Sequence, residues 1–513
     1  MSADFPFLSI LTLLPLVGAV VVAVIPRTRA ELARRVAFVW SLVVLVLSIV
    51  MWVAFKVGGD RFQFRESYAW IPNWDARFTF ATDGIGLVML MLVTVLMPIV
   101  ILAEWQEIDE ETRSVPTYFA LLLALEFTMI GVFAAADVFL FYVFFEVMLV
   151  PMYFLIGSFG GQRRQYAAVK FFLYSLVGGL FMLAAVIGLW VVGGHTFDFE
   201  KLVGAHGGID TNTARWLFLG FFIAFAIKAP FFPFHTWLPD AGGAAPAGAG
   251  GLLVGVLDKV GTFGILRYCL PLFPEASRWF APAALILAVI GIIYAALLAV
   301  GQNDLKRLVS YTSIAHFGFI GIGIFAFTTQ GGTGTVLYMV NHGLATGLLF
   351  VVVGMLAARR GSALVNDFGG AGRLVPALAG VLLFAGLASL SLPGTAPFVS
   401  EFLVLTGTFT THAAYAVVAT TGIILAAAYV LWMIQRTTQG TLNPALTEIP
   451  AMQRDITTRE KWVVAPLVLL LVLLGFYPQP VLDVINPAVQ ATLQNVGTTD
   501  PVPAAVANGR VAP

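Results

Sequence analysis

Two proline-interrupted stretches decide the fold: Ala226-Ile-Lys228-Ala-Pro230-Phe-Phe-Pro233-Phe-His235 and Leu390-Ser-Leu-Pro393-Gly394-Thr-Ala-Pro397-Phe-Val-Ser-Glu401. Each lies in a long apolar run, and each proline removes a backbone N–H and frees a carbonyl one turn earlier. Such breaks are tolerated at membrane depth only where they are buried in protein or line a wet cavity. Because an ionisable residue accompanies each break, Lys228 in one and Glu401 in the other, an ion path is favoured over a simple kink.

The composition places these breaks in a membrane protein. Of the 513 residues 59% are hydrophobic and 11% are charged, and the mean hydropathy is +0.92; soluble domains carry about 25% charged residues. The 28 basic and 28 acidic residues leave no net charge, which argues against nucleic acid as a partner because phosphate neutralisation needs clustered Lys and Arg. The single cysteine, Cys269, excludes an intrachain disulfide and a cysteine-ligated metal or iron–sulfur site.

Apolar runs of about 20 residues predict an all-α, polytopic protein with fourteen membrane spans. The run at 5–25 lacks a basic segment before it and a cleavage site after it, so we interpret it as a retained helix. Lys and Arg are more frequent in the loops on one side, which predicts that both termini lie outside. The expected spans are 5–25, 36–56, 83–103, 116–136, 137–157, 168–193, 215–233, 248–271, 280–301, 306–328, 335–358, 375–409, 412–435 and 461–480.

The two breaks also indicate an internal repeat. Residues 116–271 contain one five-helix unit and residues 272–435 a second, and each unit has its break in the fourth member. Because five is odd, the second unit is inverted, the layout associated with ion sites at discontinuous helices. The other expected segments are an N-terminal three-helix segment (1–115), a loop with the last helix (436–480) and a loosely ordered tail (481–513).

Ionisable side chains fall within or at the margins of the expected spans, where each central charge costs about 2.5–3.5 kcal/mol unless it is paired. They must therefore face one another or water, and in chain order they form a candidate relay across the midplane. Glu126 is a weak member because it has no evident partner, and Asp258 is weak because it adjoins Lys259 on a different helical face. The relay candidates are Glu146, Lys170, Lys228, Lys259, His235, His316, His342 and Glu401.

Nucleotide and cofactor motifs are missing from the sequence. It has no P-loop, no dinucleotide-binding glycine motif after a strand and no cysteine cluster. We therefore expect no cofactor and no metal in this chain, and any redox chemistry on partner subunits.

Several separate motifs resemble those of the antiporter-like membrane subunits of proton-pumping NADH:quinone oxidoreductase, respiratory complex I, and the resemblance covers about residues 80–435. The Ala- and Gly-rich composition favours a bacterial source, and the family implies the cytoplasmic membrane. The motifs are Phe141-Tyr-Val-Phe-Phe-Glu146-Val-Met-Leu-Val-Pro151, Ile227-Lys228-Ala-Pro230-Phe-Phe-Pro-Phe-His235-Thr-Trp-Leu-Pro-Asp240, Asp304-Leu-Lys306-Arg307, Tyr311-Thr-Ser-Ile-Ala-His316 and Asn341-His342-Gly343.

By this resemblance, Glu146 and Lys228 form the family's glutamate–lysine pair and Lys259 is its central lysine. Glu401 is the last proton-carrying residue, at a position where most sister subunits have lysine. His235, His316 and His342 match polar positions between them, and Lys170 matches less closely. The resemblance further implies that FMN, iron–sulfur clusters and quinone bind partner subunits, and that sister antiporter-like subunits adjoin this one in the bilayer.

The sequence departs from the family pattern at residues 241–251, Ala-Gly-Gly-Ala-Ala-Pro-Ala-Gly-Ala-Gly-Gly. The family usually places His, an acidic residue, Thr and Ser there, so the sequence does not support a polar access route at this loop. The small residues either let helices approach closely or mark an altered sequence, and the effect of this stretch is left open by the sequence. Around Glu401, Pro397 and Ser400 replace glycines expected from the family.

Three other functions are compatible with parts of this pattern. The large subunit of a multisubunit cation/proton antiporter shares the same motifs, and co-purification with flavin and iron–sulfur subunits would separate the two. A self-sufficient transporter of a small solute would take up solute as an isolated chain. A scaffold without transport would tolerate neutralising the buried charges. The identity of the cation, the stoichiometry, the trigger and the quinone are left open by the sequence.

Overall fold

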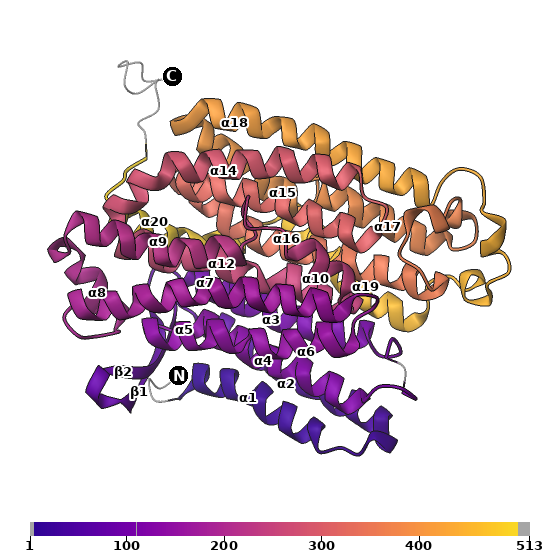
Figure 1. Ribbon diagram of the computed structural model, residues 1–513, viewed down its shortest axis with the longest axis horizontal. Coiled ribbons are helices and arrows are strands. Elements are labelled where there is room, and N and C mark those ends of the chain that lie inside the picture. The colour runs from indigo at the N-terminus through magenta and orange to yellow at the C-terminus, as the bar shows by residue number, and fades with distance from the viewer. Residues whose placement is uncertain (1–4, 109, 501–513) are drawn as a thin grey trace.

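The computed structural model describes residues 5–108 and 110–500. Most of the long helices run along the long axis of one bundle (Figure 1). The helices are α1 (Phe7–Ala23), α2 (Ala30–Ala54), α3 (Gly84–Ala103), α4 (Val115–Ala134), α5 (Val138–Val147), α6 (Leu149–Phe159), α7 (Arg164–Val192), α8 (Phe199–Ala205), α9 (Thr211–Lys228), α10 (Leu238–Ala244), α11 (Ala247–Leu252), α12 (Lys259–Gly264), α13 (Leu270–Leu272), α14 (Pro274–Val300), α15 (Leu305–Phe325), α16 (Thr329–Arg360), α17 (Pro376–Ser389), α18 (Ala396–Thr437), α19 (Thr458–Phe476) and α20 (Gln479–Val496).

The predicted helical membrane fold is confirmed, whereas the exact count of fourteen spans is not. Within the described residues, ten helices are long and apolar enough to cross a membrane, or eleven if α19 and α20, bent by 70° at their junction, count as one. Two shorter apolar helices, α1 and α17, add to these. The predicted span 375–409 combines α17 with the start of α18, and the predicted span 412–435 is the rest of α18. These two spans meet at His412, where the backbone of the long helix α18 is non-helical (φ −137°, ψ 58°).

Both predicted proline breaks are present. The first separates α9 from α10, and there the indole N–H of Trp237 donates to the carbonyl of Ile227 at 2.8 Å. The second separates α17 from α18, and there the Asn341 amide donates to the carbonyl of Ala396 at 2.7 Å. Side chains thus satisfy backbone carbonyls at each break, as a buried break at membrane depth requires.

A two-stranded antiparallel hairpin, which the sequence reading did not predict, covers one end of the bundle. It pairs β1 (Gln63–Ile71) with β2 (Ala76–Thr82), and Asp75 takes the left-handed conformation at the turn. Glu66 accepts from the backbone N–H of Leu8 at 2.8 Å, which places the start of α1 beside the hairpin. The end of α20 lies at the same end of the bundle (Figure 1). The outward orientation of this end stays a prediction.

The expectation of a loosely ordered tail from 481 onward is wrong for its first part. Residues 481–496 belong to α20, which begins at Gln479, carries one buried face and packs on α3, α13, α14 and α16. Its sequence is polar on the other face and contains Pro487, so hydropathy alone did not reveal it. Residues 501–513 of the predicted tail lie outside the described residues.

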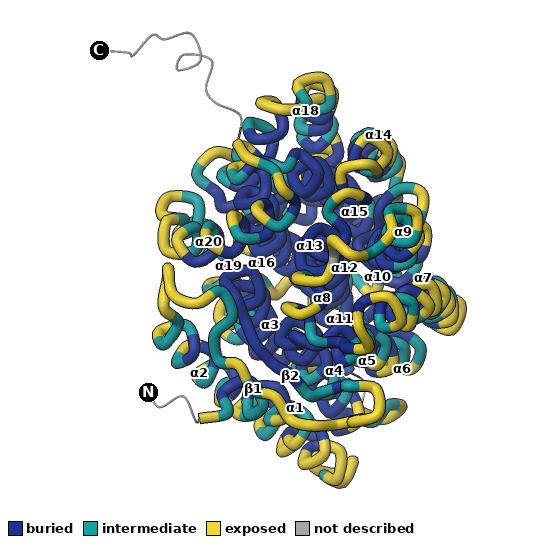
Figure 2. The backbone as a smooth tube through the Cα atoms, turned by 90° about the vertical axis from the view of Figure 1, so that its left-hand side faces the viewer, coloured by how far each residue is buried: buried dark blue, intermediate teal, exposed yellow. Residues whose placement is uncertain are grey.

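The buried centre of the bundle consists of the 247–272 segment and α16. Every residue in the most apolar stretch of both is buried, whereas much of α7 and α14 is not. Figure 2 shows this contrast between a dark interior and exposed outer helices. The exposed side of α7 carries Leu173, Val177 and Leu180, an apolar surface of the kind that faces lipid.

A buried ion pair joins the centre to α3. Nη2 of Arg267 lies 2.6 Å from Oδ1 of Asp83, and both side chains are almost fully buried. Asp83 also caps α3 by accepting from the N–H of Gly86 at 2.9 Å. Arg267 lies in an expected span, yet the sequence analysis did not single it out. Removing one member of such a pair leaves an uncompensated charge.

We expect Asp83→Ala to lower the stability of the folded subunit by about 3–5 kcal/mol, because the Arg267 guanidinium would remain buried without its counter-ion. The melting temperature of the purified assembly should fall. Asp60→Ala, at a neighbouring exposed position, serves as the control. Equal melting temperatures for the two variants would contradict the prediction.

Candidate functional site

The first predicted pair, Glu146 and Lys228, is brought together without a direct hydrogen bond. Glu146 lies near the end of α5, and a Cβ placed on Gly179 of α7 would overlap its carboxylate, so the glycine makes room for it. Nζ of Lys228 is fully buried and has no hydrogen-bond partner among the described residues. It lies 5.1 Å from the ring centroid of Phe145 and 5.7 Å from that of Phe171. The two charges attract each other electrostatically.

The central lysine is at the start of a hydrogen-bonded chain. Nζ of Lys259 lies 2.6 Å from Nδ1 of His342 on α16. It also donates to the carbonyl of Val254 and forms an ion pair with Asp258 at 3.0 Å. The His342 ring centroid is 5.2 Å from that of His316 on α15. All of these side chains are buried.

The chain continues from His316 to Glu401. Nδ1 of His316 lies 2.7 Å from the hydroxyl of Tyr338, and that hydroxyl donates to Oε2 of Glu401 at 2.6 Å. The hydroxyl of Ser391, in the break before α18, donates to the same oxygen at 2.6 Å. Glu401 is therefore held at the second break by groups from two different segments.

These contacts assign the direction of each hydrogen bond. Because a tyrosine hydroxyl has one hydrogen and donates it to Glu401, Nδ1 of His316 must donate to Tyr338. Nδ1 of His342 must accept from the Lys259 ammonium, so its proton in the neutral form is on Nε2. Nε2 of each histidine has no hydrogen-bond partner in the described chain. Every assigned donor thus points from Lys259 toward Glu401.

Sequence reasoning missed two members of this chain, Tyr338 and Ser391. Tyr338 precedes His342 by four residues on α16, so helical spacing places the two side chains on one face; this signal was available and was not used. Ser391 lies within the quoted proline break, and its φ of 64° puts it in the left-handed region. Such backbone strain in a residue other than glycine is concentrated at functional sites.

Lys170 and His235 lie away from this chain. Nζ of Lys170 pairs with Asp240 at 2.7 Å, and Nη1 of Arg307 pairs with the other oxygen of Asp240 at 2.5 Å. Although burial alone would raise it, hydrogen bonds and charge from Lys170 and Arg307 hold the pKa of the Asp240 carboxyl below its ordinary value. His235 packs beside Phe232 and Tyr294, with ring centroids 5.8 and 5.4 Å away.

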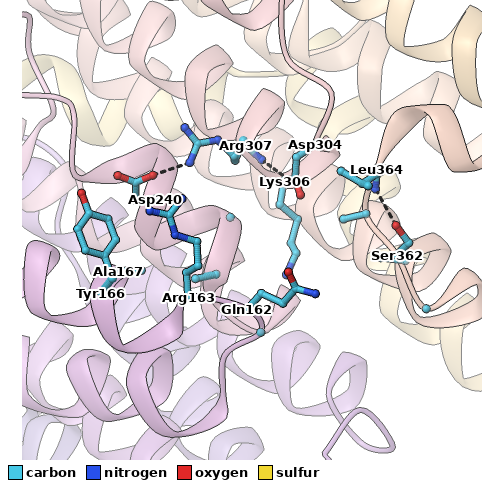
Figure 3. A pocket seen from close by; sticks show the side chains of 16 residues that line it. Gln162, Arg163, Tyr166, Ala167, Asp240, Asp304, Lys306, Arg307, Ser362 and Leu364 are labelled. Atoms are coloured by element: carbon cyan, nitrogen blue, oxygen red, sulfur yellow. Dashed lines mark hydrogen bonds and ion pairs between the residues drawn. The ribbon is translucent and has the colours of Figure 1, made fainter.

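Asp240 and Arg307 line a pocket of about 680 Å³ between α7, α10, α15 and the end of α16. Figure 3 shows Arg163, Asp240, Lys306 and Arg307 around it, with Asp240 directed at Arg307. No residue of the buried chain between Lys259 and Glu401 lines this pocket, so the two are separate. No cluster of three or more His, Cys, Asp or Glu that could hold a metal occurs within residues 5–108 and 110–500.

The small residues at 241–251 allow close helix packing, as the sequence suggested. A Cβ on Gly242 would overlap the Ser310 hydroxyl of α15, and one on Gly250 would crowd the Phe350 ring of α16. A Cβ on Gly248 would overlap Glu104. The segment thus brings α10 and α11 against their neighbours.

Glu104, at the end of α3, is a buried carboxylate that the sequence analysis did not single out. It is 1% exposed and accepts a hydrogen bond from the backbone N–H of Gly248. Burial and the nearby Glu107 carboxylate raise the pKa of Glu104 to about 7. Its titration therefore falls in the physiological range.

Comparisons with known proteins identify the family. A model of the family described as NADH:quinone oxidoreductase/Mrp antiporter, TM, matches residues 135–426. The chain is 47% identical to NADH-quinone oxidoreductase subunit M of Mycobacterium tuberculosis, over 98% of this chain and 96% of the relative. It is 38% identical to NADH-ubiquinone oxidoreductase chain 4 of Arabidopsis thaliana, over 95% of this chain and 97% of that one.

Solved structures show the same fold. A chain of respiratory complex I from Thermus thermophilus with bound NADH matches with a TM-score of 0.85 and 29% identity, covering 96% of this chain and 100% of that one. A chain of the Mrp complex from Dietzia matches with a TM-score of 0.81 and 22% identity, covering 94% of this chain and 52% of that one. Because the identity to the Mrp chain is only 22%, that likeness shows the fold alone.

We expect Glu104→Gln to remove a pH-dependent loss of stability. A carboxyl whose pKa rises from 4.5 to about 7 on folding binds more protons in the folded state, so stability falls as pH rises between these values and is constant above them. Between pH 6 and 8 this loss amounts to about 1 kcal/mol. Melting curves of the purified assembly should show this part of the slope for wild type and for Glu448→Gln, an exposed control, but not for Glu104→Gln. The same slope in all three would refute the prediction.

Proposed function

The chain belongs to the transmembrane family shared by NADH:quinone oxidoreductase and Mrp antiporters, and on that premise we propose that it moves protons across the membrane as a subunit of a bacterial NADH:quinone oxidoreductase. The observation that carries this proposal is the buried chain Lys259–His342, His316–Tyr338–Glu401. Side chains that titrate are expensive at membrane depth and mark ion paths there.

The assigned hydrogen bonds define how a proton passes along this chain. Lys259 gives a proton to Nδ1 of His342, and His342 releases its Nε2 proton toward the adjacent His316 ring. His316 takes up a proton on Nε2 and gives its Nδ1 proton to Tyr338, which passes its own proton to Glu401. His342, His316 and Tyr338 each gain one proton and lose one, so the net result is that Lys259 loses a proton and Glu401 gains one. The chain must then reorient before the next transfer.

Glu146 and Lys228 supply the switch in this proposal. A carboxylate near an ammonium favours the charged amine, and a second positive charge nearby disfavours it. Movement of Glu146 relative to Lys228 thus changes the electrostatic field at Lys259, although no proton passes from Lys228 to Lys259. We call Glu146 and Lys228 the first half of the path and the chain from Lys259 to Glu401 the second half. The absence of a hydrogen bond at Nζ of Lys228 within the described chain leaves this pair free to separate.

Energy for these movements comes from quinone reduction in neighbouring subunits, which we propose to hold FMN, iron–sulfur clusters and quinone, while this chain holds no cofactor and catalyses no redox step. Sister antiporter-like subunits are the proposed neighbours in the bacterial cytoplasmic membrane.

Both termini face outward in this proposal, and Glu401 then releases protons on the outer side through the break at Pro393–Pro397. The inverted five-helix units at 116–271 and 272–435 remain part of the same proposal.

Glu401→Gln should abolish proton translocation in inverted vesicles that contain the whole assembly, because the amide accepts no proton from Tyr338. Glu401→Lys restores a titratable group of the kind that the family resemblance implies in sister subunits, and it should retain part of the pumping. Quenching of a pH-sensitive dye and coupled quinone reduction measure both effects. Wild-type pumping by Glu401→Gln would remove this residue from the path, and pumping that follows Na⁺ instead of H⁺ would favour antiport.

Lys259→Arg should impair turnover nearly as much as Lys259→Ala, because arginine stays charged and cannot pass its proton to His342. The measurement is proton pumping per quinone reduced in vesicles with equal amounts of assembled complex, checked on native gels. Full activity in the arginine variant would reduce Lys259 to a fixed structural charge.

A further inference from the structure

Asp258 is a buried carboxylate that the proposed path does not use. Its Oδ1 lies 3.0 Å from Nζ of Lys259, and neither side chain has any exposed surface. Its Oδ2 accepts from the hydroxyl of Ser313 on α15 at 3.4 Å. The expectation that Asp258 and Lys259 point to different helical faces is therefore wrong.

A local change of helix geometry explains this pairing. Residues Leu253–Leu257 form a π-helical turn immediately before Asp258, and the N–H of Asp258 donates to the carbonyl of Leu253, five residues earlier. Lys259 folds back to donate to the carbonyl of Val254. The wider turn lets the lysine stem reach back along the helix, so that adjacent residues present opposite charges to each other. Single π turns of this kind are frequent at functional sites.

Asp258 also lies on the side of its helix that packs against the end of α9, which carries Lys228. Gly261, one turn later on the same helical face, has no room for a Cβ because the backbone of Phe225 and Ala229 at the end of α9 lies against it. Lys228 is the last residue of α9, and Asp258 attracts it electrostatically. The carboxylate thus acts on a lysine from each half.

We propose that Asp258 is the shared counter-ion of Lys228 and Lys259, a positioning residue that keeps one positive charge between the two halves of the path. This inference rests on the proposed function. When Lys228 loses the attraction of Glu146, the negative charge of Asp258 stabilises whichever of the two lysines remains charged. Lys228 and Lys259 therefore compete for one negative charge. The other titratable groups facing the pair are His316 from α15 and His342 from α16.

The chain offers a matched control in Glu126 of α4. It is also a fully buried carboxylate, and both of its oxygens lack a hydrogen-bond partner among the described residues. No charged group acts on it there. Glu126→Gln therefore reports the effect of neutralising a buried carboxylate as such, without removing a counter-ion.

The test measures proton pumping and coupled quinone reduction from pH 6 to 9 in inverted vesicles containing the whole assembly with Asp258→Asn, Asp258→Glu or Glu126→Gln. A nearby carboxylate favours the charged lysine, so its loss should move the alkaline limb of the pH profile to lower pH by roughly one unit. Coupled turnover of Asp258→Asn at pH 8 should then fall about five-fold or more, with a smaller loss at pH 6. Asp258→Glu should restore the wild-type limb, and Glu126→Gln should keep it.

Three results would overturn the inference: a wild-type profile for Asp258→Asn, an equal shift for Glu126→Gln, or a loss at all pH values without movement of the limb, which would indicate packing alone. Lys259→Ala, run alongside, separates this failure from that of the proposed function. If Lys259→Ala abolishes pumping while Asp258→Asn does not, only the counter-ion role is wrong. If Lys259→Ala pumps normally, the path itself is wrong.

Discussion

A charge buried at membrane depth must find a partner inside the protein, and the rest of this structure depends on that constraint. Arg267 meets Asp83 at 2.6 Å, Lys259 meets Asp258 and His342, and Glu401 meets Tyr338 and Ser391. Except for Asp258, which directly precedes Lys259 in the chain, the partners come from different segments, so these contacts also fix how the segments pack. Ionisation and packing are therefore determined together in the central segment 247–272 and in α16.

Irregular backbone supplies several of these partners. A regular helix presents only side chains, because its own carbonyls and N–H groups are already paired. The break before α18 places Ser391 against Glu401, and Trp237 donates to a carbonyl at the break after α9. In the π turn the N–H of Asp258 donates to Leu253 instead of Val254, whose carbonyl accepts from Lys259. Each irregularity lies beside an ionisable residue of the proposed path, so the backbone breaks and the buried charges occur together.

The sequence predicted the features that depend on local composition. It did not predict the features that depend on contacts between distant segments. Apolar runs and prolines located the helices, both breaks, and the ionisable residues inside them, including His316, His342 and Glu401. The pairing of Asp258 with Lys259 was misjudged because helical spacing assumes 3.6 residues per turn, which the π turn violates. Ser391 and the β1–β2 hairpin carry no strong periodic signal, and α20 is amphipathic with a polar face, so hydropathy favoured a loose tail. The roles of all site residues, and the inverted relation of the two units, stay predictions.

The two halves of the path differ in how they can transmit a signal. From Lys259 to Glu401 the groups are joined by hydrogen bonds with one gap between the two histidine rings, which suits transfer of the proton itself. Glu146 and Asp258 each attract Lys228 electrostatically, and no hydrogen bond joins Lys228 to either of them within the described residues. This arrangement suits electrostatic coupling without transfer of a proton. A field acts over several ångströms in a medium of low dielectric constant, so small side-chain movements near Lys228 can change proton occupancy at Lys259. The first half then controls when the second half conducts, and no continuous proton wire along the whole subunit is needed for the two to work together.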